Sequence, residues 1–181
     1  MTLGFSTQIN GKETFFVEKI WQSFQDDFTI ENFDKFCFEG IYTFSIDGAE
    51  FPAKVHTIRQ DKSDRWKAGV MIDFFINVRT ENMFRFAPKM PVLSTQKVEI
   101  IYKQNTQNLT CLGITYDRTI TVNVDDKFYG DAYLINDYVV SSSYMLEFFA
   151  LNDGFDSVED FCAYFNQDFT GKIIHWTDLK Y

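Results

Sequence analysis

A series of alternating, extended segments in the middle of the chain constrains the fold more than any other feature. Residues 92–102 place Val98, Ile100 and Tyr102 on one face of a strand, because successive side chains of a strand point to opposite faces. The same reasoning predicts further strands at 70–78, 83–86, 109–116, 119–124 and 127–135. So many strands close together in the sequence predict a sheet-rich core.

The aromatic residues agree with this interpretation. The chain holds 21 Phe, 9 Tyr and 3 Trp against 3 Pro. Large rings bury much area and fit the half-buried faces of strands. Hydrophobic residues make up 45% of the 181 residues, which is enough for the full core of one domain. We therefore expect a β-rich core with aromatic-faced helices packed on it.

Helical patterns flank the strands on both sides. Phe16, Ile20 and Phe24 recur every four residues, which predicts a helix at about 14–25. Near the other end of the chain, Ser157 and Asp160 have the spacing of a helix-capping box. The remaining predicted elements are a strand at 3–9, a helix at 29–38, a strand at 41–45, helices at 141–151 and 157–165, and a strand at 172–179.

The charge of the chain limits the nucleic acids that it can bind. The net charge is −9. A protein that binds long duplex DNA through its phosphates normally carries a basic stripe, and none is visible here, so long duplex DNA is not an expected partner. The densest basic region contains Arg59, Lys62, Arg65 and Lys67, interrupted by Asp61 and Asp64. A small ligand remains compatible, because one local pocket can be positive on an acidic protein.

The cysteines and the apolar segments indicate the compartment. Cys37, Cys111 and Cys162 are odd in number, widely spaced and without a metal-ligand pattern, which is typical of free thiols in a reducing cytosol. Residues 1–4 lack the basic and apolar regions of a secretory signal. The apolar segment 70–76 is too short to cross a bilayer. We expect a cytoplasmic protein with no membrane partner.

One short stretch, residues 52–59, concentrates polar side chains that a plain surface strand does not need. It contains Lys54, His56, Thr57 and Arg59. Thr57 and Arg59 would share one face of a strand, whereas Lys54 and His56 would lie on the other face. Pro52 favours a turn or loop just before the strand. Lys54 must therefore leave the strand alternation if it is to lie beside Thr57 and Arg59.

Together with two later segments, this stretch resembles the ASCH family of the PUA-like superfamily. Lys54, Thr57 and Arg59 match the family's G-x-K-x-x-T-x-R motif, while Pro52 stands at its glycine position. Residues 66–69, Trp-Lys-Ala-Gly, are similar to the family's turn into a strand. Residues 150–176 are similar to its acidic helix end, second helix and closing strand. The resemblance covers about residues 50–181.

The resemblance implies an α+β fold, a PUA-like small β-barrel flanked by helices, with a cleft between barrel and helices. We expect residues 1–181 to form a single domain of this type, with residues 26–49 as a helical insertion. It also implies relatedness to RNA-binding modules. The first functional hypothesis is therefore a binding module whose cleft recognises a nucleobase, a nucleotide or a short single-stranded RNA.

Some small members of the family are amidohydrolases that remove the acyl group from N4-acylated cytidine, with a Lys, a Thr and a Glu as the proposed catalytic set. Transfer by motif gives Lys54 and Thr57, and Asp153 falls at the Glu position with a side chain one methylene shorter. In this second hypothesis Lys54 is the general base, Thr57 the nucleophile or water-positioning group, and Asp153 an orienting group. Arg59 would bind an oxyanion or a phosphate.

Simpler structural interpretations remain open for these residues. Lys54 would then be exposed, Arg59 paired with Asp61 or Asp153, and Asp153-Gly154 an ordinary helix C-terminal turn. A third hypothesis is accordingly a protein-interaction domain without catalysis.

Two further side chains are candidate ligand-binding residues. Trp66 is a candidate to stack on a base, although in a chain this aromatic it also suits the core. His56 is a candidate ligand-binding residue. His56 and His175 lie on predicted strands without a third ligand in view, so we expect no metal site and no cofactor.

Overall fold

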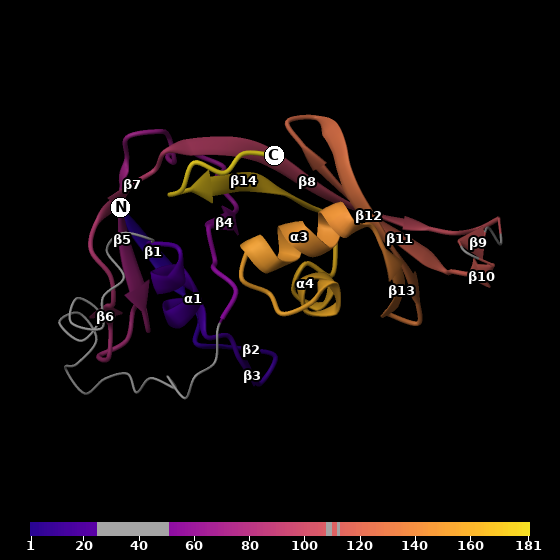
Figure 1. Ribbon diagram of the computed structural model, residues 1–181, viewed down its shortest axis with the longest axis horizontal. Helices are drawn as coiled ribbons and strands as arrows, with labels where there is room; N and C mark the ends of the chain where they lie inside the picture. Colours follow the sequence, from indigo (N-terminus) through magenta and orange to yellow (C-terminus); the bar gives the residue numbers. More distant parts are fainter. Residues whose placement is uncertain (25–50, 108–109, 112) are drawn as a thin grey trace.

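The computed structural model describes residues 1–24, 51–107, 110–111 and 113–181. These residues form a strand-rich α+β structure with three helices: α1 (Phe16–Gln22), α3 (Tyr144–Asn152) and α4 (Val158–Tyr164) (Figure 1). No helix among them is long and apolar enough to cross a membrane. The helix expected at 29–38, the strand expected at 41–45 and the insertion expected at 26–49 lie outside the described residues.

The larger sheet has six strands in the order β13-β12-β11-β8-β14-β4. Every neighbouring pair is antiparallel, and the sheet curls into a half-barrel whose concave face receives α3 and α4 (Figure 1). The strand β4 is at one edge of this sheet. The bounds are β4 (His56–Arg59), β8 (Ser94–Gln104), β11 (Arg118–Val124), β12 (Lys127–Ile135), β13 (Tyr138–Ser142) and β14 (Phe169–His175).

A smaller, four-stranded sheet lies at the other end of the molecule, beside α1 (Figure 1). Its strands are β1 (Thr2–Phe5), β5 (Met71–Ile76), β6 (Phe84–Arg85) and β7 (Met90–Pro91). β1 runs parallel to β5, so the start of the chain lies along a strand that follows about seventy residues later. Two short hairpins complete the strands: β2 (Gln8–Ile9) with β3 (Lys12–Glu13), and β9 (Thr110–Cys111) with β10 (Ile114–Thr115).

Two hydrophobic cores meet at β14. Ile174 and Trp176 belong to the core that α1 forms with the smaller sheet. Ile173 belongs to the core between the half-barrel and helices α3 and α4. Strand alternation explains this division, because consecutive side chains of β14 point to opposite faces. In the register, Thr57 of β4 lies opposite Ile174, and Ile58 lies opposite Ile173, so β4 is divided between the two cores in the same way.

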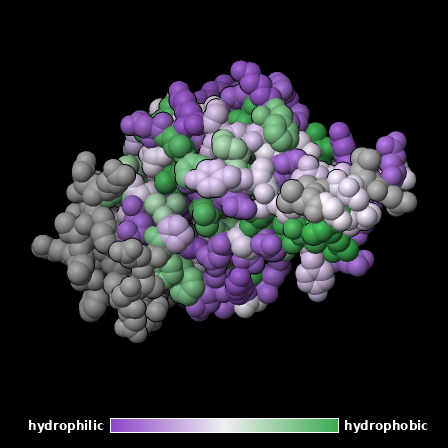
Figure 2. Space-filling model, turned by 45° about the vertical axis from the view of Figure 1, so that its right-hand side comes forward, coloured by the Kyte–Doolittle hydropathy of each residue, from purple (hydrophilic) through white to green (hydrophobic). Residues whose placement is uncertain are grey.

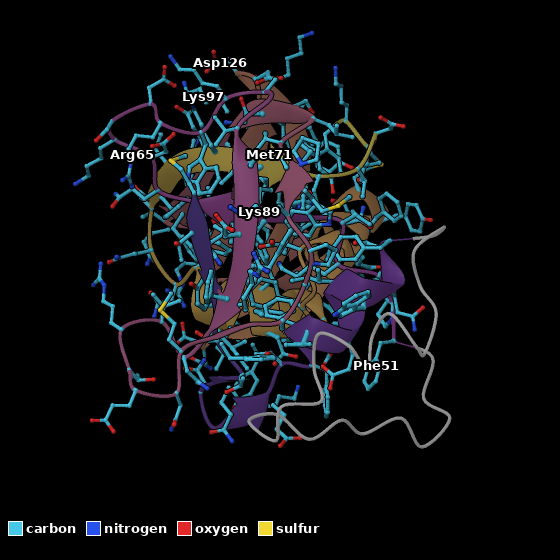
Figure 3. All side chains as sticks on the ribbon, turned by 90° about the vertical axis from the view of Figure 1, so that its left-hand side faces the viewer. Phe51, Arg65, Met71, Lys89, Lys97 and Asp126 are labelled. Atoms are coloured by element: carbon cyan, nitrogen blue, oxygen red, sulfur yellow. The ribbon has the colours of Figure 1, made fainter. Side chains whose placement is uncertain are left out.

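Several sequence-based expectations are confirmed. β12 has the predicted bounds, and Ser157 caps α4 by accepting a hydrogen bond from the backbone N–H of Asp160 at 3.1 Å. Asp125 and Asp126 form the turn between β11 and β12 with φ values of 49° and 64°. Figure 3 shows Asp126 close to Lys97, with which it forms an ion pair at 2.6 Å.

Four expected elements were wrong in their extent, and the first of them, the strand predicted at 172–179, is β14 at Phe169–His175. The single strand predicted at 109–116 is the hairpin of β9 and β10, and the strand predicted at 3–9 is divided between β1 and β2. The helix predicted from residue 141 begins only at Tyr144, because residues 138–142 pair with β12 as β13. Ser143 ends this strand and caps α3, since its hydroxyl accepts from the backbone N–H of Leu146 at 3.4 Å.

Candidate functional site

Lys54 lies just before β4, outside the strand itself. Its backbone N–H donates to the carbonyl of Lys19 in α1 at 2.8 Å. The next residue, Val55, donates to the carbonyl of Asn152 at the end of α3 at 3.0 Å. The segment therefore passes between two helices before it enters the sheet. Because β4 begins only at His56, the side chain of Lys54 does not follow the alternation of the strand.

The side chain of Lys54 forms a buried ion pair with Asp153. The Nζ–Oδ1 distance is 2.7 Å, and the same ammonium also donates to the main-chain carbonyl of Asp153. Lys54 is 1% exposed and Asp153 3% exposed. The Nζ atom is 4.6 Å from the ring centroid of Phe16 and 5.9 Å from that of Phe5. The sequence hypothesis that Lys54 is exposed is thus wrong, and the proposed partners Lys54 and Asp153 do meet.

The turn after Asp153 is shaped to admit the lysine. Gly154 has a φ of +86°, a conformation that residues with a Cβ rarely adopt. A Cβ at this position would lie 2.8 Å from Cδ of Lys54 and 3.0 Å from Cε1 of Phe16. The glycine is therefore required both by the backbone conformation and by the close approach of the Lys54 side chain.

A second buried lysine, Lys19, was missed by the sequence analysis. It is 1% exposed, and its Nζ donates to the carbonyl of Gly154 at 2.8 Å and to the Asp156 carboxylate at 2.5 Å. Lys19 and Lys54 thus bind successive carbonyls just beyond the C-terminus of α3, where cations are favoured by the helix dipole. The helical pattern gave no signal for it, because Lys19 lies beside the apolar stripe of Phe16, Ile20 and Phe24 and not within it.

Burial controls the titration of the ion pair. Desolvation lowers the pKa of Lys54 to about 8, with Asp153 opposing the shift and the charges of Arg59 and Lys19 adding to it. Desolvation also raises the pKa of Asp153, against the attraction of Lys54 and Arg59. A pH of 7 is still below the pKa of Lys54, so the Lys54 amine remains protonated and paired with Asp153.

Thr57 and Arg59 share one face of β4, but they occupy different surroundings. Thr57 is 1% exposed, and among the described residues no hydrogen bond joins it to Lys54 or Asp153. Arg59 is half-buried and donates to the carbonyl of Gly4 at 2.8 Å and to that of Ile58 at 3.1 Å. The proposed catalytic set is therefore only partly brought together, and all three of its members are enclosed.

Arg59 also lines an open groove of about 680 Å³, which we call the arginine groove. Its lining includes Gly4, Arg59, Gln60, Arg65, Trp66 and Arg79. None of the described residues that line it carries a carboxylate. Arg65 and Arg79 are exposed, and neither forms an ion pair with a described residue. Figure 3 shows Arg65 at the periphery of the molecule. Two of the three candidate ligand-binding residues, Arg59 and Trp66, thus lie at one groove.

The loop that carries Arg65 is fixed by Asp61. The Asp61 carboxylate accepts from the backbone N–H groups of Arg65 and Trp66, at 3.0 and 2.9 Å. It also pairs with Lys172 of β14 at 3.4 Å. Asp61 is therefore a partner of Lys172 and of the loop backbone, and the alternative pairing of Arg59 with Asp61 is wrong. Trp66 is 5% exposed and packs in the core of the smaller sheet, so most of its ring is not available for stacking.

His56 lies away from the groove, in the other core. It is fully buried, its Nδ1 atom is 3.1 Å from the hydroxyl of Tyr181, and its ring centroid is 5.4 Å from that of His175. Burial lowers the pKa of His56 well below its ordinary value, and the neighbouring His175 adds to the shift. The structure does not bring His56 together with Arg59 and Trp66. Within the described part of the chain, no three potential ligands are arranged to hold a metal ion.

Comparisons with protein-family models, with curated proteins and with solved structures found no match to this chain.

Proposed function

We propose that this chain is an ASCH-like, PUA-like cytoplasmic domain that binds a nucleotide or a short single-stranded RNA through phosphate groups in the arginine groove. One observation carries the proposal. Arg59, Arg65 and Arg79 surround one open groove without a carboxylate in its lining, although the chain as a whole has a net charge of −9. Guanidinium groups suit phosphate because they offer several donors in a fixed, planar geometry.

Long-range charge argues for a small ligand. The groove is a local concentration of positive charge on an acidic molecule, so a long polyanion would meet repulsion beyond it. In Figure 2, hydrophilic and hydrophobic side chains are intermingled over the face of the molecule that is shown. A nucleotide or a few nucleotides of RNA would need only the groove itself.

In this proposal the Lys54–Asp153 pair has a supporting role. It ties the segment before β4 to the end of α3, and thereby fixes the strand that presents Arg59 to the groove. Arg59 in turn donates to the carbonyl of Gly4, which also lines the groove. The buried pair therefore holds the groove in shape without contact to the ligand.

The test is fluorescence anisotropy with a labelled single-stranded RNA octamer at low salt. Removing both exposed guanidinium groups, in Arg65→Gln/Arg79→Gln, should weaken binding at least about 10-fold, because hydrogen bonds to charged groups contribute about 1.5–3 kcal/mol each. Arg118→Gln is the matched control, since Arg118 is paired with Asp137 and lies outside the groove. No binding by the wild-type protein, or equal weakening in both variants, would refute the proposal.

The second candidate is amide hydrolysis of an N4-acylated cytosine nucleoside. The lowered pKa of Lys54, about 8, favours it, because a fraction of the amine is then neutral near pH 7 and can act as a general base, with Asp153 at 2.7 Å to orient it. Against it, Lys54, Thr57 and Asp153 are each no more than 3% exposed, so a substrate would reach them only after an opening of the structure.

Incubation with N4-acetylcytidine, followed by chromatography of the released nucleoside, decides this candidate. Thr57→Val keeps the shape of the side chain and removes the hydroxyl, so it should abolish turnover if Thr57 is the nucleophile. Absence of turnover by the wild-type protein, or turnover in Thr57→Val and Lys54→Met as high as in the wild-type protein, rejects the hydrolase.

A further inference from the structure

A second hollow of about 320 Å³ lies next to the arginine groove. Its lining includes Ile58, Arg59, Gln60, Tyr164, Asn166 and Gln167, and we call it the tyrosine hollow. Arg59 and Gln60 line both hollows, so the two are neighbours across the end of β4. β4 is the edge strand of the half-barrel, and therefore no further strand of that sheet separates them.

The tyrosine hollow offers an aromatic ring in a fixed position. Tyr164 is the last residue of α4 and is 45% exposed. Its ring packs against Phe155, with centroids 5.5 Å apart, and against Phe165 at 4.8 Å. A ring that is held by two neighbours and still partly exposed provides a stacking surface at little cost in side-chain entropy.

Two carboxamides stand beside this ring. Asn166 and Gln167 are exposed and lie in the turn between α4 and β14. Within the described residues neither side chain makes a hydrogen bond to the protein. A carboxamide offers both donors and an acceptor, which is what the polar edge of a base requires. Unpaired bases of RNA are commonly bound by stacking on aromatic side chains together with hydrogen bonds to their polar edges.

We propose that the tyrosine hollow is the base subsite of the ligand whose phosphate lies in the arginine groove. This inference rests on the proposed function. The base stacks on Tyr164, Asn166 and Gln167 contact its polar edge, and Arg59 lies between base and phosphate. The ligand class is accordingly a nucleoside 5′-phosphate, either free or as one nucleotide of a single-stranded RNA, and not an isolated phosphate.

Calorimetric titration with adenosine 5′-monophosphate and with ribose 5-phosphate separates the two subsites, because only the first ligand has a base. Tyr164→Leu should weaken the nucleotide roughly 5- to 150-fold, the range found when a stacking aromatic is removed, and should leave ribose 5-phosphate unchanged. Tyr144→Leu is the matched control, since Tyr144 is a 75% exposed tyrosine on α3 and lies outside the hollow.

The possible outcomes distinguish the base subsite from the proposed function. If both ligands bind the wild-type protein equally well, the base subsite is refuted and the phosphate groove stands. If neither ligand binds, both proposals are refuted. Asn166→Ala/Gln167→Ala changes only exposed residues of a turn, so it tests the same subsite should Tyr164→Leu fail to fold. Unchanged nucleotide affinity in this variant and in Tyr164→Leu would overturn the inference.

Discussion

Replacing Lys54 by Met is the perturbation that tests most directly how the candidate site is held together. Met keeps most of the aliphatic length that packs against Gly154 and Phe16, and removes the ammonium. Asp153 then loses the charge-assisted hydrogen bond of 2.7 Å, with its carboxylate still almost fully buried. Removing one partner of a buried ion pair costs about 3–5 kcal/mol, because the other charge is left without compensation. We expect the free energy of unfolding to fall by this amount at pH 7.

The assay is urea unfolding followed by tryptophan fluorescence. Trp21, Trp66 and Trp176 are each at most 5% exposed, so they report the loss of the core directly. Lys12→Met is the matched control. Lys12 pairs with Asp160 at 2.8 Å, but its side chain is 62% exposed, and such a pair contributes only about 0–1 kcal/mol. The two variants therefore differ in the burial of the pair and hardly in its geometry.

The destabilisation caused by Lys54→Met should also depend on pH. Without Lys54, the pKa of Asp153 rises further above its value in the unfolded chain, because no neighbouring ammonium compensates the buried negative charge. The folded variant is therefore least stable at a pH at which this carboxylate is ionised. The cost of Lys54→Met should therefore be larger at pH 8 than at pH 5. In Lys54→Met/Asp153→Asn the uncompensated charge is absent, and stability should be partly recovered. A cost below about 1 kcal/mol for Lys54→Met, no larger than that of an exposed pair, would refute the buried pair.

Three further outcomes follow from buried groups. Burial holds the pKa of His175 at about 4 and that of His56 well below its ordinary 6.5, so the unfolded chain takes up protons that the folded chain does not, and stability should fall below pH 6.5. For His175 alone the loss of unfolding free energy amounts to about 3 kcal/mol by pH 4. In His175→Gln, urea unfolding at a series of pH values should show a weaker dependence of this free energy on pH, and an unchanged dependence would contradict the prediction. Gly154→Ala should cost about 2–5 kcal/mol in the same assay, because a left-handed conformation and a 2.8 Å contact are both imposed, and a cost below 1 kcal/mol would show that the turn adapts. Burial raises the pKa of Cys162 to about 12, so iodoacetamide at pH 8 should modify this thiol only in urea, as peptide mass spectrometry can check.

The sequence was sufficient for those parts of the fold that depend on local pattern. Alternation located β8, β11 and β12, and the capping residue located the start of α4. The boundary between β13 and α3 was missed, since Val139 and Ser142 fit either element until the pairing with β12 is known. Local patterns record the periodicity of a segment, whereas strand pairing decides where a segment ends.

The candidate site was foreseen only in part, for a related reason. The resemblance placed Lys54 and Asp153 together, but their burial depends on the packing of α1 against the end of α3, which also encloses Lys19. The arginine groove could not be predicted from the sequence. Arg79 arrives there because β1 runs parallel to β5, which brings Gly4 beside Val78. No local spacing indicates such a contact between segments more than seventy residues apart.

Amide chemical shifts recorded by NMR during titration with adenosine 5′-monophosphate give the most direct test of the central claim, that the arginine groove binds phosphate. We predict that the largest shifts fall at Gly4, Gln60 and Arg79, and that they disappear in Arg65→Gln/Arg79→Gln. Shifts that cluster instead around Leu93 and Leu179, in the hollow between α3 and the segment after β14, would contradict the claim, as would the absence of any shift.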